Sequence, residues 1–281
     1  MSTPIIDAHT HFWDPTKLKY HWLSSTPVLN RPYLLNDYNE ATEGIPIEKM
    51  VFVECNCISE QNEQEVLWVE EIAKQDPRIH AIVAYADMND NDGIDANLER
   101  LMAHDMVRGI RHNIQFNEIG FAIQPQFVQG ISKVLNLNRH FELCLTHDQM
   151  EECIELVSHL PERPLMLDHC GKPGIKSGAI EQWKIQLKKM SAFEHVYCKI
   201  SGLLTEADLE NWTDEDIFPY VDHVLDCFGI ERIVYGGDWP VSTLAGGYAA
   251  WNQFVQNWTD SWSPSEKKKY YYDNAAQFYK M

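Results

Sequence analysis

Short runs of branched and apolar residues recur along the chain and alternate with segments of helical periodicity. The runs are the length of strands, which predicts eight of them, over residues 4–12, 49–56, 79–87, 107–114, 141–147, 164–170, 196–203 and 232–241. Apolar residues between the runs follow helical spacing, which predicts helices over 62–75, 94–105, 125–138, 149–160, 179–191, 214–228 and 246–257. The segment Ser263-Pro264-Ser265-Glu266 has the sequence of a capping box and predicts that a last helix begins there. Strands that alternate with helices in this way predict an α/β fold, a (β/α)8 barrel.

The alternation continues without a linker, a repeat or a low-complexity tract. Residues 1–281 are therefore expected to form one barrel domain. With 44% hydrophobic and 23% charged residues, the composition is that of a folded globular chain and excludes disorder. The 42 acidic and 23 basic residues give a net charge of −19, which argues against nucleic acid or an anionic membrane surface as the main partner.

The cellular compartment is predicted from two further features. The seven cysteines are scattered without a C-x-x-C pair, so they indicate neither a disulfide framework nor a zinc ribbon. No apolar run is long enough for a membrane span, and the first residues lack the basic and apolar regions of a signal peptide. We expect a cytoplasmic protein, and a homo-oligomer is compatible with the sequence.

Polar residues cluster where the predicted strands end. Functional residues of a (β/α)8 barrel lie at the carboxyl ends of its strands. The residues found there are His9, His11, Glu54, Arg111, His147, Asp168, His169, Lys199, Ser201, Asp238 and Trp239.

His9 and His11 are two residues apart on the first strand, so their side chains are expected on one face, toward the barrel interior. Two imidazoles in that position can hold a divalent metal or orient a substrate, whereas the alternative is a pair of structural histidines. Asp238 follows the last strand, where a carboxylate can be a metal ligand or a general base. His169 is a third imidazole at a strand end.

These residues belong to motifs that resemble a known family. The motifs are D-A-H-T-H-F-W-D-P from Asp7, D-H-C-G-K-P from Asp168 and Y-G-G-D-W-P from Tyr235. They are similar to the amidohydrolase superfamily, in its amidohydrolase-related (type 2) branch, and within it to the sugar-lactonase group. The resemblance spans essentially the whole chain.

The resemblance implies roles for individual residues. His9, His11, His169 and Asp238 would form the catalytic cluster and hold any metal, with Asp238 as the general base. Arg111 would bind the substrate or polarise its carbonyl. The strand over 107–114 contains no lysine, so a two-metal site bridged by a carboxylated lysine is not expected. One zinc ion or no metal at all are both compatible with this group.

Other residues are candidates for substrate contacts. Glu54, Lys199 and Arg111 are expected in the barrel interior, and Gly109 is expected to leave room there for a ligand. Trp22 and Trp239 could form an aromatic wall beneath a sugar. In zinc decarboxylases of the same branch a histidine near the position of His147 is a metal ligand, so His147 is a further candidate.

The sequence thus predicts a hydrolase that opens the ring of a lactone, most plainly a sugar-acid lactone, with an activated water. Two alternatives stay open. One is a zinc-dependent nonhydrolytic decarboxylase of the same branch, which would use His147. The other is a non-catalytic binding protein on the same barrel.

Overall fold

Eight parallel strands, each paired with the next in chain order, form one sheet that curls into a barrel. The computed structural model describes residues 3–281. The strands are β1 (Ile5–Thr10), β2 (Ile47–Val53), β3 (Ile79–Tyr85), β4 (Val107–Arg111), β5 (His140–Leu143), β6 (Leu165–Leu167), β7 (Val196–Ile200) and β8 (Ile233–Tyr235). A parallel bridge between Thr10 and Trp239 joins the first strand to the segment after the last. The predicted (β/α)8 fold is confirmed.

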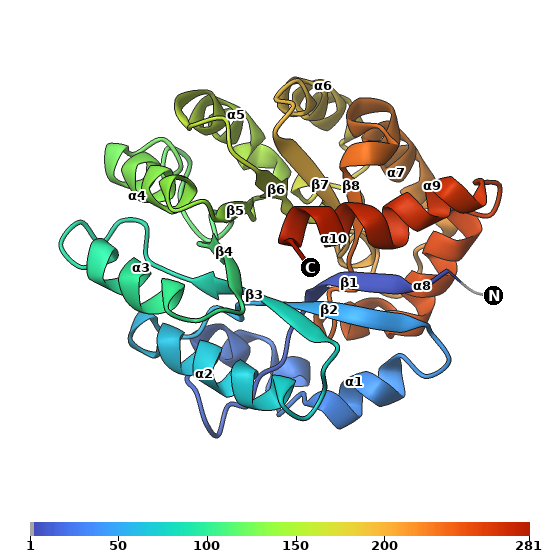
Figure 1. Ribbon diagram of the computed structural model, residues 1–281. Coiled ribbons are helices and arrows are strands. Elements are labelled where there is room, and N and C mark those ends of the chain that lie inside the picture. The colour runs from blue at the N-terminus through green and yellow to red at the C-terminus, as the bar shows by residue number, and fades with distance from the viewer. Residues whose placement is uncertain (1–2) are drawn as a thin grey trace.

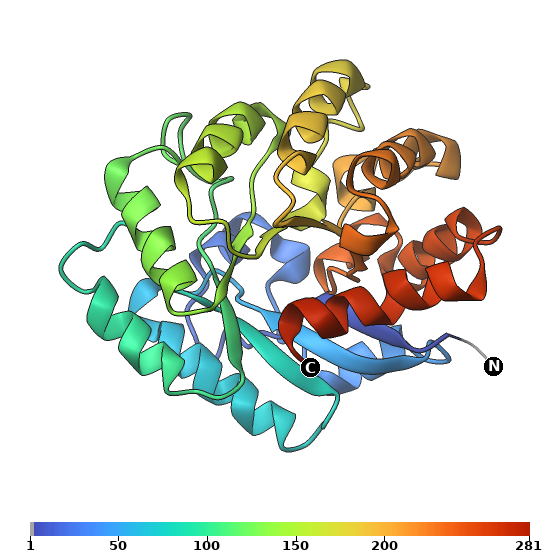
Figure 2. The same cartoon turned by 45° about the horizontal axis from the view of Figure 1, so that its top comes forward.

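Helices surround the strands on the outside (Figures 1 and 2). They are α1 (Leu35–Ala41), α2 (Asn62–Ala73), α3 (Ile94–Met102), α4 (Pro125–Asn136), α5 (Met150–His159), α6 (Ile180–Ser191), α7 (Asp214–Phe228), α8 (Gly247–Trp258), α9 (Pro264–Lys268) and α10 (Asn274–Tyr279). All seven helices predicted from periodicity are present. The capping box is also confirmed, because Ser263 N donates to Glu266 Oε2 at 2.8 Å and Ser263 Oγ accepts from Glu266 N at 3.3 Å.

The strands are shorter than the apolar runs predicted. The run over 232–241 contains the three-residue strand β8, and the run over 4–12 contains β1. The extra residues leave the sheet but stay buried in the loops that follow it, and an apolar run reports burial rather than hydrogen bonding. These loops form the end of the barrel at which polar residues gather.

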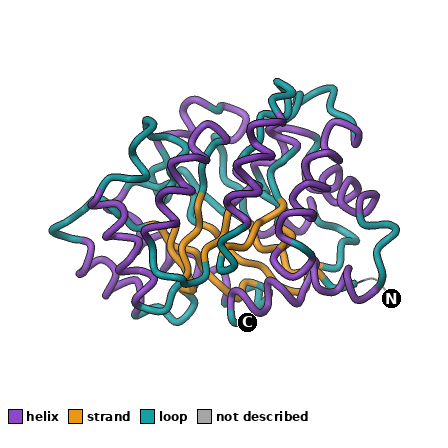
Figure 3. The backbone as a smooth tube through the Cα atoms, turned by 90° about the horizontal axis from the view of Figure 1, so that it is seen from above, coloured by secondary structure: helices purple, strands orange, loops and turns teal. Residues whose placement is uncertain are grey.

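The barrel interior has an apolar layer and a charged layer. The apolar layer includes Ile6, Val51, Val83 and Val234, and α10 covers it at the end where the strands begin. Figure 1 shows α10 lying across that end, and Figure 3 shows the barrel from another side, with its strands enclosed by helices and loops. The charged layer lies further along the strands, where Glu142, Asp168 and Lys199 are fully buried.

Among residues 3–281, no helix has the length and the apolar character needed to cross a bilayer.

Candidate active site

An irregularity in β1 brings both of its histidines into the barrel. Strict alternation would place Asp7, His9 and His11 on one face, but the pairing register with β2 shifts between Asp7 and Thr10. Asp7 therefore points outward, to hydroxyls of Tyr38 and Tyr248, while His9 and His11 point inward. A bulge next to a site commonly re-aims a side chain in this way.

Asp7 holds two backbone segments of the site together from the outer side of the barrel wall. Its carboxylate accepts hydrogen bonds from the backbone N–H groups of His9, at 3.1 Å, and Gly237, at 2.7 Å. Burial raises the pKa of Asp7 to about 6, although the four donors around it favour its charge. Asp7 thus joins the segment that carries the histidines to the loop that carries Asp238.

His9, His11 and Asp238 bring three ligand atoms to one point. The two Nε2 atoms are 3.1 Å apart, and Asp238 Oδ1 lies 3.7 Å from that of His9 and 3.6 Å from that of His11. Atoms bound to one tetrahedral zinc ion are about 3.4 Å apart, given bonds of ~2.1 Å. His11 Nδ1 donates to the Val53 carbonyl at 2.8 Å, so in the neutral ring Nε2 presents its lone pair to the cluster. The residues therefore fit a single divalent metal ion.

The chemistry of Asp238 is set by the groups around it. Burial opposes its charge, but the imidazoles of His169 and His11 and the Lys172 ammonium outweigh that effect and hold the pKa of Asp238 below its usual value. Asp238 is therefore ionised at neutral pH. Its backbone has a φ of 51°, an uncommon value for a residue with a side chain, at the turn that directs the carboxylate inward.

His169 is placed by an unusual stretch of backbone. His169, Cys170, Gly171 and Lys172 all have positive φ, between 45° and 71°. Such a run is strained for side-chain-bearing residues, and strain of this kind concentrates at functional sites. His169 Nδ1 lies 3.0 Å from Ser201 Oγ. Burial, together with the charges of Lys172 and Arg111, lowers the pKa of His169 to about 3 despite the attraction of Asp238.

Arg111 is held by buried carboxylates. Its Nε donates to Glu54 Oε1 at 2.6 Å, its Nη2 to the Glu54 carbonyl at 2.7 Å and its Nη1 to Asp168 Oδ2 at 3.2 Å. The same Nη1 lies 3.4 Å from His9 Nε2. Arg111 borders the pocket, but most of its donors are directed to the protein.

A pocket of about 190 Å³ opens above this cluster. Sequence reasoning placed His11, Trp22, Glu54, Arg111, His169 and Asp238 at the site, and all of them line it. Trp13, a further candidate for the aromatic wall, also lines it. Sequence reasoning did not assign roles to other lining residues, which include Asn56, Asn113, Gln115, Phe116, Cys144 and Lys172. These come from loops, where no periodicity indicates direction, although Lys172 stands in the D-H-C-G-K-P motif and could have been found there.

Of the two cations that line the pocket, Lys172 forms fewer ion pairs than Arg111 does. Its ammonium has one acidic partner, Glu206, at 3.6 Å. Burial alone would lower its pKa, yet acidic groups around it, Glu206 and Asp238 among them, hold the pKa of Lys172 above its usual value. Lys172 is thus a charged donor facing the pocket.

Three residues that the sequence placed at the site do not line the pocket. Lys199 is on the interior face of β7 but below the pocket, where its ammonium contacts Glu142 Oε2 at 2.7 Å and Asp168 Oδ1 at 3.0 Å. His147 begins a short 3₁₀ turn and its Nδ1 lies 3.0 Å from the Lys172 carbonyl, outside the three-ligand cluster. Trp239 is buried against Phe12, Tyr33 and Tyr38.

The expected space beside Gly109 is filled by the protein itself. A Cβ on Gly109 would lie 2.1 Å from Nε2 of His140, so the missing side chain accommodates that imidazole and not a ligand. The prediction that Gly109 leaves room for substrate was wrong, because the neighbouring strand β5 contributes a large side chain at the same level.

Comparisons with known proteins identify the family of this chain. The uncharacterised protein y4mH of Sinorhizobium fredii is 31% identical over 296 residues, which cover 99% of this chain and 98% of that one. An L-fucono-1,5-lactonase of Burkholderia ambifaria is 28% identical and the match covers 98% and 95% of the two chains. A crystal structure of an amidohydrolase of Burkholderia multivorans with bound zinc has a TM-score of 0.88 and 27% identity over 99% of each chain. The model of the amidohydrolase family matches residues 6–281. This chain therefore belongs to the amidohydrolase family.

Proposed function

We propose that this protein hydrolyses a sugar-acid lactone. The observation that carries the proposal is an ionised Asp238 beside three imidazoles at the bottom of a pocket that Lys172 and Arg111 also border. Hydrolysis of an ester needs a base for the water and positive charge where the carbonyl oxygen becomes anionic. The likeness to a protein named L-fucono-1,5-lactonase supports the choice of lactone.

Asp238 acts as the general base. Its carboxylate takes a proton from a water molecule as the water oxygen adds to the lactone carbonyl carbon. The bond from that carbon to the ring oxygen then breaks, and the protonated Asp238 returns its proton to the departing oxygen. His169, neutral and held by Ser201, is positioned to hydrogen-bond the water or the leaving hydroxyl.

Lys172 supplies positive charge for the carbonyl oxygen, because its ammonium faces the pocket and has only a distant acidic partner. Arg111 contributes by its charge and by holding Glu54 and Asp168 in place beneath the cluster. We assign it mainly to positioning.

His9, His11 and Asp238 would hold one divalent metal ion, with His169 beside them. When bound, zinc supplies Lewis acidity, which lowers the pKa of a water ligand and polarises a carbonyl.

The pocket walls suit a sugar ring. Trp22 and Phe116 present aromatic surface to the C–H faces of a sugar, and the amides of Asn113 and Gln115 can pair with its hydroxyl groups. Trp22 is fixed by a hydrogen bond from its Nε1 to the Cys55 carbonyl at 2.8 Å. Phe116 is 64% exposed, so substrate binding would remove it from water.

We further propose that the chain works as one domain over residues 1–281, in the cytoplasm, on a small molecule and without nucleic acid. The seven free cysteines support a reducing compartment. The net charge of −19 supports the absence of a nucleic-acid partner.

A panel assay tests the function. Purified protein is offered aldonolactones of both ring sizes, and ring opening is followed by the acid released. The same preparation is offered hydroxybenzoates, and carbon dioxide is measured. We expect ring opening of at least one aldonolactone and no decarboxylation. Carbon dioxide release without lactone opening would instead favour the decarboxylase, and activity on neither class would favour a binding protein.

A further inference from the structure

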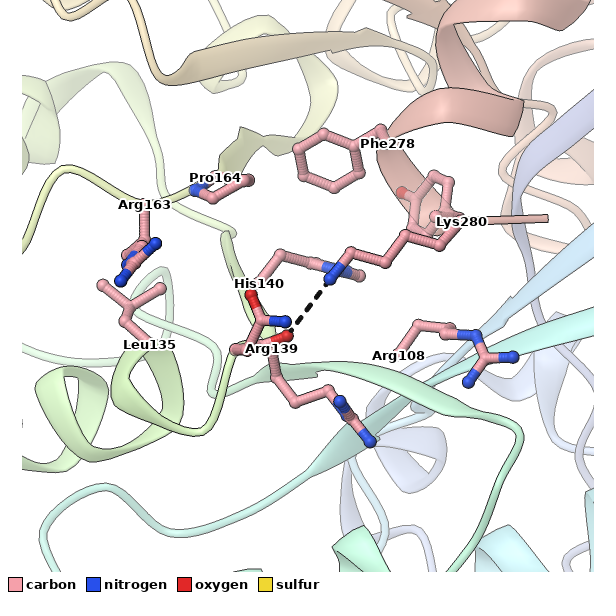
Figure 4. Close-up of a pocket in the computed structure, with 10 residues that line it drawn as sticks. Arg108, Leu135, Arg139, His140, Arg163, Pro164, Phe278 and Lys280 are labelled. Atoms are coloured by element: carbon pink, nitrogen blue, oxygen red, sulfur yellow. Dashed lines mark hydrogen bonds between the residues drawn. The ribbon is translucent and has the colours of Figure 1, made fainter.

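Cationic side chains at the two ends of the barrel differ in how they are held. At the end where the strands begin, a cavity of about 60 Å³ is lined in part by Arg108, Arg139 and Arg163. Figure 4 shows these three side chains pointing in different directions, so their charges do not converge on one point. Lys172, at the other end, borders the pocket above the Asp238 cluster, and both its main chain and its ammonium are held by other residues.

His147 holds the main chain of Lys172 with two hydrogen bonds. Its backbone N–H donates to the Lys172 carbonyl at 3.3 Å, and its imidazole Nδ1 lies 3.0 Å from the same oxygen. A carbonyl oxygen only accepts, so Nδ1 carries the hydrogen and donates it. The carbonyl has two lone pairs, and one residue of the loop after β5 engages both of them.

The backbone of Lys172 needs such support. Lys172 has a φ of 45° and a ψ of 69°, and it is the last of four consecutive residues with positive φ that begin at His169. Because Lys172 precedes Pro173, extended backbone would be favoured at this position. An unfavoured conformation of this kind persists only where the surrounding contacts hold it. The two hydrogen bonds from His147 are contacts of that kind.

The rest of the imidazole of His147 lies against the same loop. A Cβ on Gly174 would lie 3.1 Å from both Cε1 and Nε2 of His147, so the missing side chain gives the ring its place. Nε2 lies 3.6 Å from Oδ1 of the exposed Asp148. Among residues 3–281, His147 belongs to neither group of candidate metal ligands. Its position therefore favours a role in holding the loop after β6 over the role of a metal ligand.

The ammonium of Lys172 is directed by Glu206. Glu206 Oε1 lies 3.6 Å from Lys172 Nζ, and the Glu206 carbonyl accepts a hydrogen bond from Lys176 N at 2.9 Å, which ties Glu206 to the same loop. The ion pair is longer than a hydrogen bond, so the three donors of the ammonium stay available. His147 thus sets where the Lys172 side chain begins, while its end can still contact a substrate.

We propose that His147 is a positioning residue for the reaction and acts through Lys172. The inference rests on the proposed lactone hydrolysis, in which the Lys172 ammonium stabilises the anionic carbonyl oxygen. By holding the Lys172 carbonyl, His147 keeps the left-handed turn closed and the ammonium within reach of that oxygen. Without the Nδ1–H donor the turn would relax toward extended backbone, and the ammonium would move away from the reacting carbonyl.

Steady-state kinetics of three variants test the proposal. His147→Leu removes the donor and should lower kcat/KM by about tenfold to a hundredfold, because a displacement of ~1 Å near the reacting atoms is that costly. His147→Asn keeps an N–H group bonded to Cγ, as Nδ1 is, and should restore kcat/KM to within about threefold of wild type. His159→Leu replaces an exposed histidine at the end of α5 and should leave kcat/KM within about twofold.

A double-mutant cycle with Lys172→Met separates positioning from a general loss of structure. If His147 acts through Lys172, His147→Leu should change kcat/KM by less than about twofold once residue 172 is already Met. Equal losses from His147→Leu in the two backgrounds would overturn the proposal. A His147→Asn variant as impaired as His147→Leu would also overturn it.

Hydrogen exchange keeps this test separate from the test of the function. Lys172 N donates to the His169 carbonyl at 2.9 Å within the turn, so exchange of that amide reports whether the turn stays closed. We expect faster exchange in His147→Leu than in wild type and in His147→Asn. Unchanged exchange would overturn the proposal. Faster exchange in a protein whose wild type opens no lactone would contradict the proposed function and would still support the hold of His147 on Lys172.

Discussion

At the scale of single residues, the proposed catalytic groups meet at Gly202. A Cβ placed on Gly202 would lie 2.6 Å from His169 Nδ1 and 2.7 Å from Asp238 Oδ2. Real Cβ atoms do not approach other atoms so closely, so any side chain at this position must displace the imidazole or the carboxylate. The absence of a side chain at Gly202 is therefore a condition for the arrangement.

Gly202→Ala is expected to lower kcat/KM by about a hundredfold or more, because small displacements of reacting groups are costly. Gly229→Ala is the matched control. Gly229 has nearly the same positive φ, 66° against 64°, but nothing lies within 4 Å of its added Cβ. Both variants place an Ala at nearly the same positive φ, so equal losses of activity in the two would contradict the role given to the space at Gly202.

Replacement by Met is expected to affect mainly stability at Arg111 and mainly activity at Lys172. Arg111→Met strands the buried Glu54 and Asp168 carboxylates and should lower the free energy of unfolding by about 3–5 kcal/mol. Lys172→Met should lower kcat/KM by about 10²–10³, the scale of one oxyanion donor, with a small change in Tm. Urea unfolding and steady-state kinetics of both variants give the comparison. The opposite pattern would exchange the two roles.

The sequence predicts which residues face the barrel interior better than it predicts how deep they lie. His9, His11 and Arg111 border the cluster as expected, and Lys199 also faces inward. Alternation gives the face but not the level along the barrel axis, and Lys199 ends up in the charged layer below the pocket. Lys172 stands in the D-H-C-G-K-P motif, but the direction of its side chain was missed because it depends on a left-handed turn that no periodicity encodes.

At the scale of secondary-structure elements, α2 brings a buried acid to the edge of the site. Glu65 accepts a hydrogen bond from Cys55 N at 3.3 Å, directly after the residue Glu54 that binds Arg111. Burial and the nearby charge of Glu54 raise the pKa of Glu65 to about 8. Glu65 is thus protonated in the folded protein under conditions where it is ionised in the unfolded chain.

This shift predicts a pH dependence of stability. A carboxyl whose pKa is raised on folding stabilises the protein fully below its unfolded pKa, near 4.5, and the stabilisation is lost as the pH rises to about 8. Wild type should therefore lose several kcal/mol, at ~1.4 kcal/mol per unit of pKa shift, relative to Glu65→Gln between pH 5 and 9. Urea unfolding of both proteins across this range measures it. Glu71→Gln is the control, because Glu71 lies on an exposed part of α2, and its free energy of unfolding should follow that of wild type across the pH range. If the free energy of unfolding of Glu65→Gln also followed that of wild type, the raised pKa of Glu65 would be contradicted.

The order of elements was predictable from the sequence, whereas the short elements were not. The seven helices with clear periodicity were found, but α1 and α10 have only seven and six residues, too few to show a period. The cover that α10 gives to the barrel follows from tertiary packing.

At the scale of the whole molecule, residues 3–281 contain one group of candidate metal ligands that includes Asp238. The second candidate group, formed by His9, Asp168 and His169, shares His9 with the first, so the two cannot be filled independently. Asp168 is moreover committed to Arg111 and Lys199. We therefore expect at most one metal ion per chain in active protein. Elemental analysis that gave two equivalents would overturn this prediction.

The proposal that Asp238 is the base for lactone opening is tested most directly by kcat/KM of Asp238→Asn on the lactone that wild type opens fastest. Asn keeps the size of the side chain but cannot take a proton, so we expect a loss of about 10³ or more, with an unchanged circular dichroism spectrum. Ring opening by a folded Asp238→Asn protein within about tenfold of wild type, a factor too small for the loss of a general base, would contradict the proposal.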